Sequence, residues 1–131
     1  MRTIPTAPEI LRAVSHYLRE TLAPGLPPAD RFGVLVAANA VDIAAREAMT
    51  GAAADEASLG RIRALLGVEA GTLDQLDACL AEAIGTGALP LDHAGLRDHL
   101  IATTLDELAI DQPGYASIAR MTGDSERAPA A

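Results

Sequence analysis

The side chains with the widest chemical use in this sequence are three histidines and one cysteine. His93 and His99 stand six positions apart on a predicted helix, or about 240° around its axis, so they do not share a metal ion. We expect each histidine, His16 included, at the surface or beside a helix cap. Cys79 is the only cysteine and cannot form an internal disulfide. Because no residue near it in the sequence would activate the thiol, we expect a buried structural cysteine. No metal site and no cofactor is predicted.

Paired carboxylates are the other group that could act in catalysis, as general acid and general base. The pairs are Asp55–Glu56, Asp74–Asp77 and Asp106–Glu107. Such a pair works when an apolar pocket gives its two carboxyl groups different proton affinities. These residues have polar neighbours instead, which is typical of a solvated helix face. The sequence therefore predicts no catalytic residue.

One group of residues could instead recognise a partner protein. Arg46 and Glu47 follow Asn39 by seven and eight positions, so the three lie along a mostly apolar face of one predicted helix. One interpretation is a buried asparagine that fixes the helix register, with an Arg–Glu pair at the rim. The other is a polar notch that binds the backbone of a partner.

A second candidate is Tyr115, in the segment LAIDQPGYA at residues 108–116. Pro113 and Gly114 stop the preceding helix and deliver the tyrosine to a fixed place. Tyrosine is a common interface anchor because it combines a large area with a hydroxyl. The alternative is that Tyr115 folds back over the end of the helices. The candidate partner-binding residues are thus Asn39, Arg46, Glu47 and Tyr115.

The helices that would position these residues follow from apolar side chains at helical spacing. Helix starts are predicted from capping boxes at Thr6–Glu9 and Thr72–Gln75 and from single caps at Asp30 and Asp92. The helices span roughly residues 6–22, 30–49, 55–66, 72–85 and 92–111. The helix at 30–49 is apolar on two opposite faces, one with Phe32 and Val36 and one rich in alanine, so we expect it at the centre.

The predicted fold class is therefore all-α, a compact bundle of about five helices around a central helix at residues 30–49. Leu, Ile, Val and Ala must form the core, because aromatic residues make up only 2% of the chain. Residues 1–5 are expected to be a lead-in, residues 6–117 a single helical domain, and residues 118–131 a flexible tail.

Charge and composition exclude several partners. A net charge of −8 and a pI near 4.7 argue against binding to nucleic acid or to an anionic membrane surface. No apolar run approaches the roughly 20 residues that span a bilayer. There is no lysine, which excludes Schiff-base chemistry. A lone cysteine and the lack of an apolar signal segment favour the cytoplasm.

Several motifs together resemble a small bacterial family of unknown function. They are a capped first helix, AANAVDIAARE at residues 37–47, LLG at residues 65–67, and HLIATTLDELAIDQPGY at residues 99–115. The resemblance covers roughly residues 5–117. Members of that family are typically encoded beside an aminoglycoside-phosphotransferase-like kinase and an acyl-CoA-dehydrogenase-like enzyme. Where the family often has a basic residue after the final proline, this chain has Gly114.

The resemblance implies a function that the residues alone do not. The chain is similar to the accessory subunit that works with the 4-hydroxyacyl-CoA kinase of levulinate-type hydroxy-acid catabolism. A non-catalytic partner of a phosphotransferase-like kinase is therefore expected. The alternative is a stand-alone helical homodimer that binds an acyl chain or another apolar ligand. An exposed apolar groove would favour a protein partner, and an enclosed apolar cavity would favour the ligand carrier.

Overall fold

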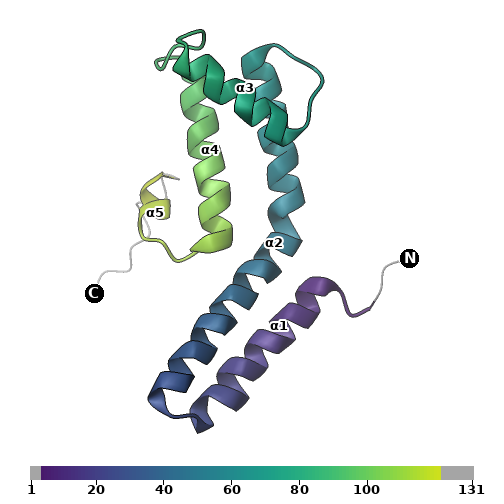
Figure 1. Cartoon of the computed structure of the whole chain (residues 1–131), viewed down its shortest axis with the longest axis vertical. Coiled ribbons are helices and arrows are strands. Elements are labelled where there is room, and N and C mark those ends of the chain that lie inside the picture. Colours follow the sequence, from purple (N-terminus) through teal and green to yellow (C-terminus); the bar gives the residue numbers. More distant parts are fainter. Residues whose placement is uncertain (1–3, 122–131) are drawn as a thin grey trace. The chain divides into compact units, whose positions relative to one another are not determined.

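The structure, a computed structural model, describes residues 4–121 and shows only helical elements there, which confirms the all-α class (Figure 1). The elements are α1 (Ala7–Tyr17), the π-helical turn η1 (Leu18–Leu22), the 3₁₀ turn η2 (Ala23–Gly25), α2 (Pro28–Leu66), α3 (Leu73–Gly85), α4 (Ala94–Asp111) and α5 (Ser117–Met121). The expected tail from residue 118 includes residues of α5, in which the Ile118 amide donates to the Tyr115 carbonyl at 3.0 Å; its flexibility stays a prediction. Residues 1–3 and 122–131 lie outside the described part.

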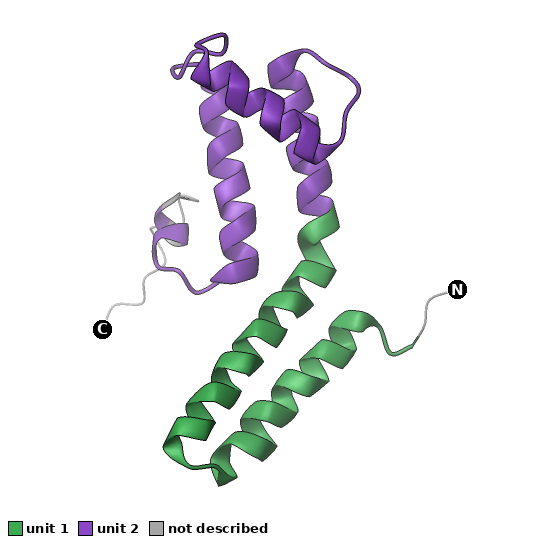
Figure 2. Cartoon of the chain, viewed as in Figure 1, with its two compact units in different colours: residues 1–52 green, residues 53–131 purple. Residues whose placement is uncertain are grey.

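The chain divides into two compact units, Met1–Ala52 (unit 1) and Ala53–Ala131 (unit 2), shown in green and purple in Figure 2. Helix α2 contributes residues 28–52 to unit 1 and residues 53–66 to unit 2. The expectation of a single domain over residues 6–117 stays a prediction, since this division describes packing and not independent folding.

The first helix begins where the capping box predicted it. The Thr6 amide and hydroxyl both donate to the Glu9 carboxylate, at 2.7 and 2.8 Å. These bonds satisfy a free backbone donor at the helix start and hold the pKa of Glu9 below its ordinary value. The helix then passes through η1 and η2, and Arg31 of α2 donates to the carbonyls of Ala23, Pro24 and Leu26.

The structure corrects the prediction of two separate helices at residues 30–49 and 55–66. A single helix, α2, runs from Pro28 to Leu66. Four of the eight residues between Thr50 and Ala57 are alanine, the strongest helix former, and they outweigh the roughly 1 kcal/mol cost of Gly51. Pro28 begins α2, a position at which the missing amide hydrogen of proline costs no hydrogen bond of the helix. Asp30 therefore lies in the first turn of the helix rather than at its cap.

Unit 1 is a hairpin in which α1 lies antiparallel to residues 28–52 (Figure 1). The fully buried apolar side chains described in this unit are small, namely Ala23, Ala38 and Ala45. Phe32 is 71% exposed and Val36 50% exposed, so the expectation that both faces of this segment are covered is wrong. The alanine-rich face packs on α1 because alanine lets two backbones approach closely.

Unit 2 holds the large buried side chains. Ile62 of α2, Leu76 and Leu80 of α3, Leu89 and Leu96 form one cluster. Leu59, Leu65, Leu66, Leu73, Ala83 and Ile84 pack against it. These contacts confirm the predicted apolar stripes of residues 59–66 and 73–84, in which each side chain follows the last by three or four positions.

Two details of α3 and α4 depend on their caps and partners. The Thr72–Gln75 capping box is present, with bonds of 3.0 and 3.4 Å. His93, not Asp92, caps α4, since its Nδ1 accepts from the Gly95 amide at 3.1 Å. The spacing of Leu96, Leu100 and Leu108 predicts that they share a buried face of this helix, but Leu100 is 51% exposed.

Candidate partner-binding surfaces

Asn39 belongs to a polar cluster on one edge of the unit 1 hairpin. Arg19 reaches across from η1 and donates to Asn39 Oδ1 and to Asp42 Oδ2, both at 2.6 Å. Asn39 is exposed, so the interpretation of a buried asparagine that fixes helix register is wrong. A long arginine on the neighbouring helix holds this amide at the surface, which the pattern of one helix alone does not show.

The same cluster tunes Asp42. The Ser15 hydroxyl, Arg19 and the charge of Arg46 together keep the pKa of the Asp42 carboxyl below its ordinary value, and they outweigh partial burial. Ser15 is itself buried and lies 3.5 Å from the Ala38 carbonyl. A carboxylate held ionised beside two arginines makes this edge of unit 1 a network of fixed charges.

Glu47 lies apart from that network. Its carboxylate covers the buried Gly51, so that a side chain at Gly51 would overlap it. Arg46 is half-buried, and its charge acts on Asp42. Among the four candidates, Asn39 and Arg46 therefore share the Asp42 network, whereas Glu47 is occupied locally.

Tyr115 lies in the turn between α4 and α5 and is 48% exposed. Its amide donates to the Gln112 carbonyl at 2.9 Å, and its carbonyl accepts from Ile118 at 3.0 Å. The backbone is therefore fixed on both sides while much of the ring stays open to solvent. Tyr115 belongs to unit 2 and the other three candidates to unit 1, so no single unit contains all four.

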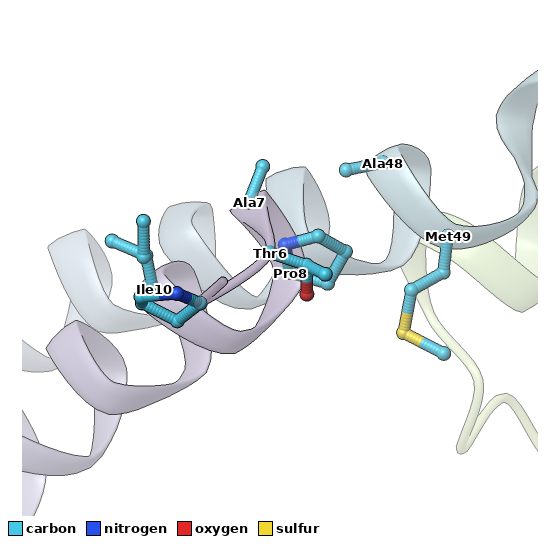
Figure 3. A pocket seen from close by; sticks show the side chains of 7 residues that line it. Thr6, Ala7, Pro8, Ile10, Ala48 and Met49 are labelled. Atoms are coloured by element: carbon cyan, nitrogen blue, oxygen red, sulfur yellow. The ribbon is translucent and has the colours of Figure 1, made fainter. Parts of the chain in front are cut away.

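The other edge of the unit 1 hairpin is apolar. Ile10, Val14 and Tyr17 follow one another by four and three positions on α1 and are between 43% and 54% exposed. All three line a shallow groove of about 400 Å³. A second open hollow, of about 700 Å³, lies between the start of α1 and the segment around Ala48 and Met49, and Ile10 lines both (Figure 3).

We call this surface the hairpin face and define it by two rows. On α1 it consists of Ile10, Val14 and Tyr17; on α2 it consists of the exposed residues Ala37, Ala44 and Ala48. The α2 residues are spaced by seven and four positions and so share one stripe. Ile10 and Ala48 line the same hollow, which places the two rows side by side.

The sequence model of a domain of unknown function, DUF6285, matches residues 24–115, more than half of the chain. The chain belongs to the DUF6285 family. No curated protein and no solved structure matches it. This membership agrees with the resemblance to a small family of unknown function, and all four candidate residues lie within the DUF6285 match.

A polar cluster inside the DUF6285 match was missed by sequence reasoning. His99 is only 3% exposed, against the expectation of a surface position. Arg61 Nε donates to His99 Nδ1 at 3.3 Å, and the same guanidinium reaches Thr103 at 3.3 Å and Asp106 at 3.5 Å. The signal was present, because residues 99, 103 and 106 have the spacing of one helix stripe.

The buried histidine is neutral. Burial, and then the charge of Arg61, lower the pKa of His99 below its ordinary value, while Asp77 opposes them. Since Nδ1 accepts from Arg61, the ring proton is carried on Nε2. The cluster thus joins α2 to α4 in unit 2 and has the character of a structural link.

Other expectations about chemistry have mixed outcomes in the DUF6285 chain. Cys79 is exposed rather than buried, because Leu76 and Leu80 take the inward positions of α3. The part of the chain that the structure describes holds no group of three or more His, Cys, Asp or Glu side chains able to bind a metal ion. It also holds no helix that combines the length and apolar character needed to cross a bilayer.

Charge is divided very unevenly between the two units. Residues 1–52 contain five arginines and five acidic residues, whereas residues 53–131 contain five arginines and thirteen acidic residues. The whole net charge of −8 therefore belongs to unit 2. On α3, Asp74, Asp77 and Glu82 are all exposed.

Proposed function

We propose that this chain is a non-catalytic, cytoplasmic accessory subunit that binds and supports a phosphotransferase-like hydroxyacyl-CoA kinase in short-chain hydroxy-acid or acyl-CoA catabolism. The family resemblance supplies the identity of the partner. The observation that carries the proposal is the concentration of the entire net charge in unit 2. A strongly acidic surface accelerates association with a basic one and rejects partners of like charge.

The geometry of α3 suits that role. Leu76 and Leu80 point into the core while Asp74, Asp77 and Glu82 face solvent. The carboxylates are thus presented by a helix whose other side is anchored. A rigid acidic ridge of this kind binds a basic partner without first being ordered, which lowers the entropic cost of association.

The direct test is co-expression of the full chain with the phosphotransferase-like kinase that the resemblance implies. We expect the two to elute as one complex in size-exclusion chromatography. Phosphorylation of a short-chain hydroxyacyl-CoA is expected to require both proteins. Full kinase activity in the absence of this chain would contradict the proposal.

A matched pair of variants tests the acidic surface. The double variant Asp77→Asn with Glu82→Gln removes two negative charges from the exposed side of α3. It is expected to slow association with the kinase about tenfold at low salt, because electrostatic steering depends on charge. Glu20→Gln with Asp30→Asn removes the same charge from unit 1 and is expected to leave the rate unchanged. Stopped-flow or biolayer measurements at two salt concentrations distinguish the outcomes; equal effects of the two double variants would contradict a role of unit 2.

Tyr115 is tested separately as an anchor. If it binds the kinase, Tyr115→Ala is expected to weaken the complex by about 2 kcal/mol, as for an interface hot spot. A dissociation constant unchanged within twofold would show that the ring only covers the turn after α4. Gln112→Ala, in the same turn, is the control for local disturbance.

A second function, binding of an acyl chain or other apolar ligand, is favoured by the hollow of about 700 Å³ in unit 1 (Figure 3). Its volume is in the range of small-molecule sites. The hollow is open to solvent, however, and such surfaces more often meet another protein. Saturable binding of a fluorescent fatty acyl probe, lost in Ile10→Glu, would favour this alternative.

A further inference from the structure

The hairpin face contains apolar side chains that unit 1 leaves uncovered. Ile10, Val14 and Tyr17 stay about half-exposed, whereas the buried apolar side chains described in the unit are alanines. Two helices alone cannot enclose large side chains, and four-helix bundles commonly solve this by adding a second pair. The occupant of the face must therefore be deduced from charge and shape.

Charge favours a second copy of this chain. In unit 1 five arginines balance five acidic residues, so two copies that meet there bring no net charge together. Contact between two copies of unit 2 would oppose −8 to −8, which is unfavourable at low salt. Arg19 and Asp42 are not among the residues of the hairpin face, and one charged residue, Glu9, lines the groove along Ile10, Val14 and Tyr17.

Shape favours the same occupant, and we infer that two copies pair their hairpin faces about a two-fold axis parallel to the helices. This operation keeps each residue at its height and places α1 of one copy over α2 of the other. Ile10 and Ala48 share a height, since both line one hollow. Val14 and Ala44 each lie about one turn further along the hairpin. The large side chains on α1 of one copy therefore meet the alanines on α2 of the other.

The size of the face agrees with a dimer of moderate affinity. Residues 7–22 extend over about 24 Å, and two helices are about 20 Å wide, which gives roughly 500 Å² in projection. The accessible area of a corrugated surface exceeds its projection. Specific interfaces begin near about 600 Å² per partner, so the face lies near the lower limit of size for a specific interface.

The experiment is a measurement of mass by light scattering and sedimentation on the purified full chain and on matched variants. The wild-type chain is expected to reach twice the monomer mass as its concentration rises. Val14→Glu, in the centre of the face, is expected to weaken self-association at least a hundredfold. Phe32→Glu introduces the same charge at a more exposed position outside the face and is expected to dimerise as the wild type does.

A third variant separates shape from charge. Ala44→Leu keeps a strong helix former but places a large side chain among the alanines of α2, where the partner copy's large side chains would lie. It is therefore expected to weaken the dimer at least tenfold with unchanged circular dichroism. The inference is overturned if the wild-type chain stays monomeric at every concentration, or if Val14→Glu and Phe32→Glu behave alike. A hairpin face that binds the kinase instead would give the first of these results together with loss of the complex in Val14→Glu.

Discussion

His99 is a buried polar side chain that joins two helices of unit 2. It accepts a hydrogen bond from Arg61, which also reaches Thr103 and Asp106. Because Arg61 has several partners, its burial is compensated. The neutral form of His99 is thus favoured, because a protonated ring would place a positive charge beside the Arg61 guanidinium.

The stability of the chain is therefore expected to fall as the pH is lowered from 7.5 to 5.5. The folded pKa of His99 lies below its ordinary value of 6.5, so the unfolded chain binds more protons between the two values. The contribution of His99 is complete above pH 6.5 and is lost as the pH falls through that value toward the folded pKa. Urea unfolding at several pH values measures this slope.

His99→Gln tests the origin of that slope. The variant retains an acceptor for Arg61 but does not titrate, so we expect a loss of about 1 kcal/mol at pH 7.5 and a flatter dependence down to pH 5.5. His16→Gln, on the exposed side of α1, is the control. A wild-type slope retained in His99→Gln would show that other groups cause it.

Asp42 gives a second prediction about a single residue. Its pKa is lowered by Ser15 and by Arg19, so Ser15→Ala and Arg19→Gln are each expected to raise the pKa of Asp42. Nuclear magnetic resonance titration of the carboxyl carbon measures both. The stabilisation involved is present above the ordinary value of 3.8 and is lost as the pH falls through the lower folded value. An unchanged pKa of Asp42 in both variants would contradict these causes.

At the scale of elements, the sequence predicts helix starts and buried faces best where they depend only on residues within the same helix. The capping boxes at Thr6 and Thr72 and the core stripe around Ile62 need only local spacing, and the structure confirms them. The predictions fail where a neighbouring helix intervenes. His99 is buried beside Arg61 of another helix while Leu100 is exposed, which the apolar pattern of α4 alone does not show.

The candidate partner-binding residues were likewise predictable only where their surroundings are local in the sequence. The turn at Tyr115 could be located from Pro113 and Gly114, since these residues act on the backbone beside them. The environment of Asn39 could not, because its partner Arg19 lies twenty positions earlier on another element. Residues 50–57 interrupt the apolar pattern and were therefore predicted as a break, because that pattern takes no account of the helix propensity of their alanines.

The continuity of α2 is tested by Gly51→Ala. The new methyl group meets only the flexible end of Glu47, which can turn into solvent, so a gain of about 0.5–1 kcal/mol in helix stability is expected. Gly60→Ala, where no atom lies within 4 Å, is the control for propensity alone. Thermal unfolding by circular dichroism compares them, and a loss of stability in Gly51→Ala only would mean that Glu47 is held in place.

At the scale of the whole molecule, the two units differ in how they are stabilised. Unit 2 buries Ile62 and Leu96 completely, whereas the described core of unit 1 consists of small side chains. Burial of large apolar side chains supplies most of the favourable free energy of folding. Unit 2 is therefore expected to be the more stable unit in a dilute solution of single chains.

Hydrogen exchange followed by mass spectrometry measures this difference. At low protein concentration, amides of α1 are expected to exchange at least tenfold faster than those of α3, because local opening is easier where few large contacts are lost. Protection of α1 is expected to rise with concentration if copies pair through the hairpin face. Equal protection of α1 and α3 in dilute solution would contradict the ranking.

The exposed position of Cys79 has a practical consequence for such measurements. The natural chain offers a single thiol on the outer side of α3, so one spin label or fluorophore attaches at one defined point without any substitution. In a preparation of paired chains, each assembly then carries two probes and yields one distance distribution. Dipolar spectroscopy on the unaltered protein would thereby read out its assembly directly.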